Sequence, residues 1–157
     1  MSDNKEATDV REYPSRPFIG VGVVVLKEEM ALLIRRGKPP KQGEWSLPGG
    51  SQNVGETVRE TAAREVREET GVEIKEAHFL EVIDAIIPDR DGRTKYHYTL
   101  IDFVAEWAAG EAVAADDAEH AEWVSLNRLD ELELWEKTRR VIRKAARLRE
   151  LGYPAEP

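Results

Sequence analysis

Short apolar runs separated by polar turns mark the first part of the chain. Phe18–Leu26 is rich in Val and Ile, and a second run, Met30–Ile34, follows the polar turn at 27–29. Short runs rich in β-branched residues are typical of buried strands, so the pair predicts a hairpin. Gly20 and Gly22 interrupt the first run, which indicates that another part of the molecule packs closely there.

Two further apolar runs, His78–Ile87 and Tyr96–Trp107, flank the turn-rich segment Pro88–Gly92 and predict a second hairpin. Glu119–Val124 predicts one more short strand. The segment 35–50 is rich in glycine and proline, which excludes a helix and predicts an ordered loop.

Two segments have helical character. Glu56–Thr70 contains no proline or glycine and is rich in good helix formers, and Gly71 is placed to end it in a left-handed cap. Leu132–Leu151 has apolar residues at helical spacing with Arg and Lys opposite, which predicts an amphipathic helix packed on a sheet. Its basic face is interpreted as a solvated surface rather than an anion site; it comprises Arg139, Arg140, Arg143, Lys144, Arg147 and Arg149.

The net charge narrows the range of partners. The chain has 31 acidic and 23 basic residues and a formal charge of −8. This balance disfavours nucleic acid and anionic membrane surfaces, so we expect neither as a partner. An anionic small-molecule substrate would then need a local cationic site.

Composition and length bear on location and domain organisation. The absence of cysteine excludes a disulfide framework and a thiolate nucleophile, and it suits the cytoplasm, where we expect a soluble protein. Residues 1–15 form a polar segment without the features of a signal peptide, and we expect a flexible tail there. Residues 16–157 are expected to form a single domain.

One pattern carries the chemistry: Gly50-x5-Glu56-x7-Arg64-Glu65-Val66-x-Glu68-Glu69-x-Gly71-Val72. On a helix Glu65, Glu68 and Glu69 share one face at i, i+3 and i+4. A solvated acidic face is the simpler interpretation. The glycines at both ends and the preceding Arg64 favour instead oxygen ligands for a hard divalent cation. Because the chain has no cysteine, Mg²⁺ is the expected ion and Mn²⁺ is the alternative. An ion held between protein carboxylates and substrate phosphates implies hydrolysis of a phosphate anhydride.

This pattern resembles the signature of the Nudix hydrolases. The resemblance implies an α/β fold, an α/β/α sandwich with a mixed central sheet. It also implies that Glu68 and Glu69 ligate the metal, that Glu65 is a further ligand or the catalytic base, and that the main-chain carbonyl of Gly49 completes the coordination. Arg64 would hold neighbouring acidic side chains in place, with direct phosphate contact as the alternative.

Four residues outside the pattern are candidates for the site. By the resemblance, Glu119 is an additional metal ligand or the catalytic base; a surface acidic loop is the alternative. Arg35 and Arg36 could bind a diphosphate, although arginines at strand ends are often only solvated. Tyr98 could stack on a base.

The flanking segments resemble the bacterial ADP-ribose pyrophosphatase-like group, and Pro88 lies sixteen residues after Val72, where that group has a proline. The resemblance implies hydrolysis of ADP-ribose to AMP and ribose 5-phosphate. Removal of pyrophosphate from nucleoside triphosphates is an open alternative, and a catalytically silent nucleotide sensor is a more remote one. RNA cap removal is disfavoured by the acidic balance. Family members are often homodimers, so a homodimer is a further expectation.

Overall fold

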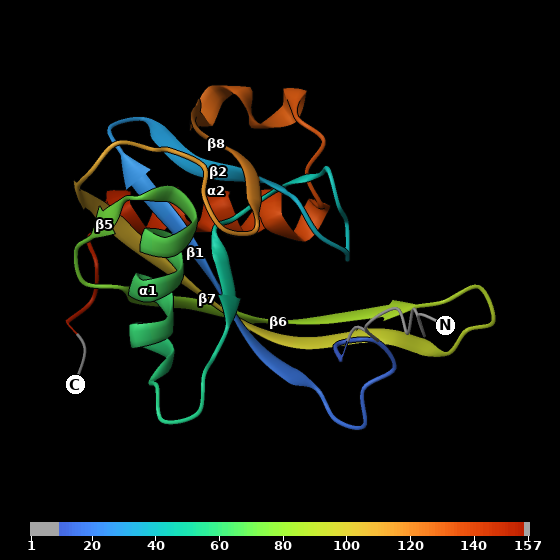
Figure 1. Ribbon diagram of the computed structural model, residues 1–157. Helices are drawn as coiled ribbons and strands as arrows, with labels where there is room; N and C mark the ends of the chain where they lie inside the picture. The colour runs from blue at the N-terminus through green and yellow to red at the C-terminus, as the bar shows by residue number, and fades with distance from the viewer. Residues whose placement is uncertain (1–9, 156–157) are drawn as a thin grey trace.

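Eight strands form one mixed sheet between two helices in the computed structural model, which describes residues 10–155 (Figure 1). The strands are β1 (Phe18–Lys27), β2 (Met30–Arg36), β3 (Trp45–Ser46), β4 (Gly49–Ser51), β5 (Glu73–Ile74), β6 (His78–Pro88), β7 (Thr94–Ala109) and β8 (Ala118–Ser125). The helices are α1 (Val58–Thr70), the 3-10 helix η1 (Leu126–Glu131) and α2 (Glu136–Leu151). The predicted α/β/α sandwich with a mixed sheet is confirmed.

Strand β1 lies at the centre of the sheet. It pairs in parallel with β7 and antiparallel with β2 and β4. Strand β6 pairs antiparallel with β7, and β8 pairs antiparallel with β2. The residues of β1 from Val23 to Leu26 are almost fully buried, as expected for a strand covered on both faces.

Each face of the sheet has its own apolar core. The core on the α1 side includes Val66 and Val72 of the helix region and Phe103 of β7. The core on the α2 side includes Val141 and Ile142. Side chains from one strand alternate between the two cores, so β1 joins both layers and sets the positions of the helices.

Local signals in the sequence explain where α1 begins and ends. The Thr57 side chain accepts a hydrogen bond from the Glu60 main-chain N–H at 3.1 Å and caps the N-terminus. Gly71 has φ 72° and ends the helix in the left-handed conformation, as predicted.

The C-terminal helix is shorter than the sequence predicts. The helix expected over Leu132–Leu151 begins only at Glu136, and its N-cap residue, Trp135, has ψ 132°. Leu134 instead forms an isolated bridge with Trp45. The apolar periodicity therefore continues upstream of the helix because an extended segment also packs against the core, and the predicted start was wrong.

Segment 35–50 contains no helix, as predicted, yet it is not only a loop. It includes β3, which pairs with β2, and the first two residues of β4, which pairs with β1. Strand β5 was also missed. Strands of two or three residues have no periodicity of their own and form because their partners present a free edge.

The basic face of α2 is not simply solvated, and that interpretation was wrong for several of its members. The Arg139 side chain is 13% exposed and donates hydrogen bonds to the Leu129 and Leu132 carbonyls. Arg140 pairs with Glu81, and Arg149 pairs with Glu106. Arg139 thus binds α2 to η1 and the segment after it, and Arg140 and Arg149 bind the helix to strands β6 and β7.

The β6–β7 hairpin extends from the body of the molecule as a long arm (Figure 1). The chain before β1 contacts this arm, because the Tyr13 hydroxyl donates to Asp89 and the Tyr13 main-chain N–H donates to Lys95 O. Of the predicted flexible tail, residues 1–9 lie outside the described residues. No helix within residues 10–155 combines the length and apolar composition that a membrane-spanning segment requires.

Candidate active site

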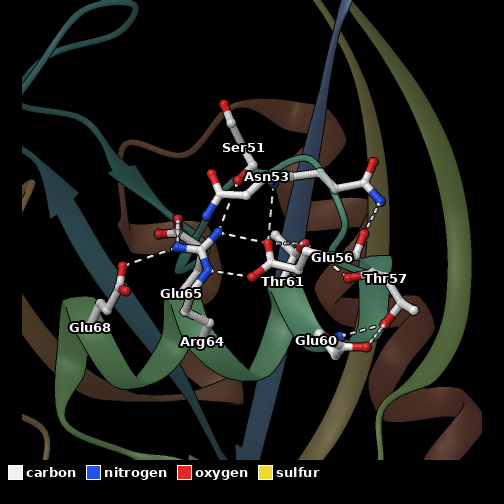
Figure 2. Close-up of polar contacts among 10 residues, drawn as sticks. Ser51, Asn53, Glu56, Thr57, Glu60, Thr61, Arg64, Glu65 and Glu68 are labelled. Atoms are coloured by element: carbon white, nitrogen blue, oxygen red, sulfur yellow. Dashed lines mark hydrogen bonds and ion pairs between the residues drawn. The ribbon is translucent and has the colours of Figure 1, made fainter.

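Arg64 is the centre of a charged network on α1 (Figure 2). Its guanidinium donates two hydrogen bonds to Glu56, at 2.6 and 2.9 Å, and one each to Glu65 at 2.7 Å and Glu68 at 3.1 Å. A fifth hydrogen bond, at 3.0 Å, reaches the Ser51 carbonyl. Through these contacts one side chain holds three carboxylates and ties α1 to β4.

Two glycines of β4 bring the main chain against the carboxylates of α1. The Gly49 N–H donates to Glu69 Oε1 at 2.8 Å. A Cβ atom at Gly50 would lie 2.4 Å from the Glu65 carboxyl carbon, and one at Gly49 would lie 1.9 Å from the Val21 carbonyl oxygen. Glycine at position 50 therefore allows the close approach to Glu65, and glycine at position 49 allows β4 to lie close to β1.

Burial and hydrogen bonding shift the acidities of these carboxyls in opposite directions. Hydrogen bonds from Arg64, and then from Thr61, lower the pKa of Glu56 to about 2. Burial raises the pKa of Glu69 to about 8 against the opposing hydrogen bond from Gly49, and burial also raises the pKa of Glu65. Ionised Glu65 and Glu69 are thus unfavourable together unless a cation lies beside them.

The donor set suits a hard divalent cation. Carboxylate oxygens of Glu65, Glu68 and Glu69 and the main-chain carbonyl of Gly49 are the ligand types that Mg²⁺ and Mn²⁺ prefer. Within residues 10–155, no three His, Asp or Glu side chains converge closely enough to hold a metal ion. Glu65 and Glu68 instead accept hydrogen bonds from Arg64, and its positive charge neutralises part of their negative charge.

A cleft of about 1020 Å³ begins at Glu65 and Glu69 and runs along the sheet toward α2, whereas Glu68 lies outside its lining. Cationic side chains expected for an anionic substrate line it: Arg11, Arg36, Lys38, Lys41 and Lys137. Apolar and aromatic side chains line the rest, among them Leu47, Ile83, Leu100 and Trp135. A cleft that joins clustered acids, cations and an apolar recess has the composition of a small-molecule site.

The structure brings only some of the predicted substrate-binding residues to the cleft. Arg36 lines it and donates to the Pro40 carbonyl, and burial lowers the pKa of its guanidinium. Tyr98 also lines the cleft, and its ring lies 5.9 Å from that of Phe18. Arg35 lies outside the lining, with its guanidinium 5.0 Å from the Trp45 ring centre.

Glu119 also lies outside the cleft lining, near the start of β8 and beside Gly37. Its neighbour Asp117 lines the cleft and pairs with Lys38 at 2.6 Å. Asp117 lies in the turn before β8, whereas Glu119 lies within the strand, so the turn brings the first acid and not the second to the cleft.

Sequence reasoning also missed Asp102, which is 4% exposed and lines the cleft. Burial, and then the nearby Glu81 charge, raise the pKa of Asp102 to about 7. A single aspartate inside the apolar run Tyr96–Trp107 was a usable signal, because an ionisable residue in a buried strand needs an explanation.

Comparison with known proteins identifies the family. The sequence profile of the NUDIX domain matches residues 16–145, most of the chain. The chain belongs to the Nudix family. It is therefore a hydrolase of a family that acts on pyrophosphate bonds, and Nudix hydrolases generally use a divalent metal.

Two relatives illustrate the range of the family. The chain is 40% identical over 126 residues to a protein of Methanocaldococcus jannaschii named ADP-ribose pyrophosphatase, a match that covers 79% of this chain and 72% of that one. It is 30% identical over 149 residues to the NAD-capped RNA hydrolase NudC of Stutzerimonas stutzeri. That second match covers 94% of this chain and half, 50%, of the relative.

Solved structures share the fold. A MutT NUDIX hydrolase from Burkholderia pseudomallei superposes with a TM-score of 0.71 at 29% identity, covering 82% of this chain and 98% of that one. The NUDIX domain of Shewanella oneidensis NrtR, solved in complex with ADP ribose, gives a TM-score of 0.70 at 20% identity. It covers 87% of this chain and 90% of that domain, and at this identity the likeness concerns the fold alone.

Proposed function

We propose that the protein hydrolyses ADP-ribose to AMP and ribose 5-phosphate. The observation that carries this proposal is the continuous cleft of about 1020 Å³, which links Glu65 and Glu69 of α1 to apolar side chains and has the size of a small-molecule site. Pro88, at the position associated with ADP-ribose hydrolysis, also lines the cleft. The 40% identity to a protein named ADP-ribose pyrophosphatase supports the same substrate.

Mg²⁺ is the proposed cofactor, with Mn²⁺ as a substitute, held by Glu65, Glu68, Glu69 and the Gly49 carbonyl. When bound, such an ion neutralises phosphate charge and lowers the pKa of a coordinated water. Glu65 or Glu69 would accept the proton of the attacking water, and Asp117 takes the place of Glu119 as the outer acid at this end of the cleft. Arg64 would position Glu65 and Glu68 without touching the substrate.

The cations along the cleft would bind the diphosphate. Arg36 is fixed by its hydrogen bond to Pro40, and Lys38 is drawn toward Asp117, so both have defined positions before substrate arrives. Tyr98 would contact the nucleoside part. Arg35 is no longer proposed to touch the substrate, because its guanidinium lies over Trp45.

Release of pyrophosphate from a nucleoside triphosphate is the second candidate. The 29% identity to a MutT NUDIX hydrolase favours it, and the carboxylates of α1 would serve either reaction. That nucleic acid is not a substrate stays a prediction from the charge balance. Homodimer formation and a cytoplasmic location also stay predictions.

Product analysis with Mg²⁺ tests the proposal on ADP-ribose, NADH, diadenosine polyphosphates, nucleoside triphosphates and a short NAD-capped RNA. AMP from ADP-ribose well above every other product is the expected result. Pyrophosphate from a triphosphate, or turnover confined to capped RNA, would overturn it. The matched blank is Glu69→Gln, which keeps the shape of the buried side chain and should lower activity by at least about 10²-fold.

A further inference from the structure

Asp102 is a buried carboxyl on the floor of the cleft that the proposed hydrolysis does not use. Among residues 10–155, few polar or charged residues are almost fully buried: Thr61, Glu69, Thr70 and Asp102. Thr61 donates to Glu56, Thr70 donates to the Val66 carbonyl, and Glu69 accepts from Gly49. Asp102 alone of this set lacks a role in the α1 network.

The fold makes room for this carboxyl. Gly22 of β1 is the register partner of Asp102 on the parallel strand β7, and a Cβ atom at Gly22 would lie 2.5 Å from Asp102 Oδ1. The same atom would lie 3.5 Å from Leu47. The glycine predicted to allow close packing therefore leaves the space that the Asp102 carboxyl occupies.

The carboxyl has few partners inside the protein. The Gly22 main-chain N–H hydrogen-bonds to it. Arg140, whose positive charge acts on Asp102, donates its hydrogen bonds to Glu81 on the neighbouring strand, at 2.8 and 3.0 Å. A buried carboxyl with spare acceptor capacity is unfavourable unless a ligand donates hydrogen bonds to it.

The position of Asp102 fits a nucleotide held at the carboxylates of α1. Gly22 pairs with Gly49 on one side and with Asp102 on the other. Two strand spacings separate the main chains of Gly49 and Asp102, about 10 Å. This distance is comparable with the length of a nucleoside monophosphate, so a phosphate near Gly49 leaves the base beside Asp102. Leu100 and Ile83 of the cleft lining provide apolar surface for its ring.

We propose that Asp102 accepts a hydrogen bond from the exocyclic amine of the substrate's nucleobase and thereby selects amino-bearing bases such as adenine. This inference rests on the proposed function only in placing a nucleotide in the cleft. An ionised carboxylate accepts but cannot donate, so it pairs with an amine and opposes a carbonyl oxygen at the same place. The carboxylate thus both favours one base and rejects the other.

Binding of AMP and IMP tests the proposal, because IMP carries a carbonyl oxygen where AMP carries the amine. Titration calorimetry at about pH 8 keeps Asp102 mostly ionised, above its pKa of about 7, while the base of IMP stays neutral. The wild-type protein should bind AMP about 10- to 100-fold more tightly than IMP, as expected for one hydrogen bond to a charged group. Equal affinities, or no binding of either nucleotide, would overturn the proposal.

Two substitutions and a control give the specificity readout. Asp102→Leu should abolish the preference for AMP, and Asp102→Asn, which retains the size and adds an N–H donor, should reduce it. Glu81 is the register partner of Asp102 on β6 and lies outside the cleft lining. Glu81→Gln therefore removes a charge close to Asp102 and should leave the ratio of the AMP and IMP affinities unchanged. Circular dichroism checks folding, and Asp102→Asn serves alone if Asp102→Leu does not fold. An unchanged ratio in Asp102→Asn would overturn the proposal.

Hydrolysis of ADP-ribose by the wild-type protein is measured in addition to nucleotide binding. The proposed function and the proposed role of Asp102 can then be refuted independently of each other. Turnover of ADP-ribose with equal affinities for AMP and IMP would overturn the role of Asp102 and leave the proposed function standing. Preference for AMP that depends on Asp102, without turnover of ADP-ribose, would support the role and overturn the proposed substrate.

Discussion

Gly50→Ala should damage the active site and leave the fold nearly intact. The new Cβ would lie 2.4 Å from the Glu65 carboxyl carbon, and ordinary contact begins at 3.4 Å, so the carboxyl must move by the difference, 1.0 Å. No positive φ is involved at Gly50. The atoms that must give way belong to the end of the Glu65 side chain and not to the main chain. The carboxyl can therefore shift, against its hydrogen bond from Arg64, while the main chain stays in place.

The expected magnitudes for activity and stability differ. A displacement of about 1 Å in a catalytic group can cost about 10²-fold in rate, so kcat/KM should fall by about that factor. The added methyl group overpacks the site, which lowers the free energy of unfolding by about 1 kcal/mol at the lower end of the usual range. Alanine also restricts the unfolded chain more than glycine does, and this effect raises the free energy of unfolding by about 0.4–1 kcal/mol, which offsets most of that loss. The unfolding midpoint should therefore change little.

A double-mutant cycle identifies the cause. In a Glu65→Ala background the carboxyl that clashes is absent, so Gly50→Ala should lower kcat/KM no further. The assay is hydrolysis of ADP-ribose with Mg²⁺, paired with thermal unfolding of the metal-free proteins. Full activity in Gly50→Ala would refute the placement of the Glu65 carboxyl against β4. Equal losses in both backgrounds would show that Gly50 acts through something other than Glu65.

Two further predictions concern the Arg64 network. Arg64→Ala should lower both the unfolding midpoint and kcat/KM, because Glu56, Glu65 and Glu68 lose their shared cation. Thermal unfolding measures the first and steady-state kinetics the second. A loss of rate with an unchanged unfolding midpoint would favour direct contact between Arg64 and a phosphate. The pKa of Glu56 is lowered from 4.5 to about 2 in the folded protein, so its stabilising effect is present above pH 4.5 and is lost as the pH falls through this range. Urea unfolding of wild type and Glu56→Gln should therefore differ at neutral pH and converge in acid, and a difference independent of pH would contradict the assignment.

Features set by neighbouring residues could be predicted from the sequence. The end of α1 at Gly71 and its three carboxylates at helical spacing were predicted, whereas the helix begins at Val58, after its cap at Thr57, and not at Glu56 as expected. The main strands were also found, because β-branched runs between polar turns have a period of their own. The helical spacing of the acidic residues was therefore enough to predict the acidic cluster without any tertiary contact.

The tertiary structure decided what depends on pairing between distant segments. Asp102 faces Gly22 from another strand, and Asp117, in the turn before β8, lines the cleft where Glu119 does not. The extended start at Leu132–Trp135 follows from contact with Trp45. Strand register and segment docking are set by the cooperative burial of both faces of a sheet, and no single stretch of sequence contains both partners. The sequence thus determined the family, the helix that carries the acidic cluster and the class of reaction, whereas the folded chain decided which side chains line the cleft that a substrate would enter.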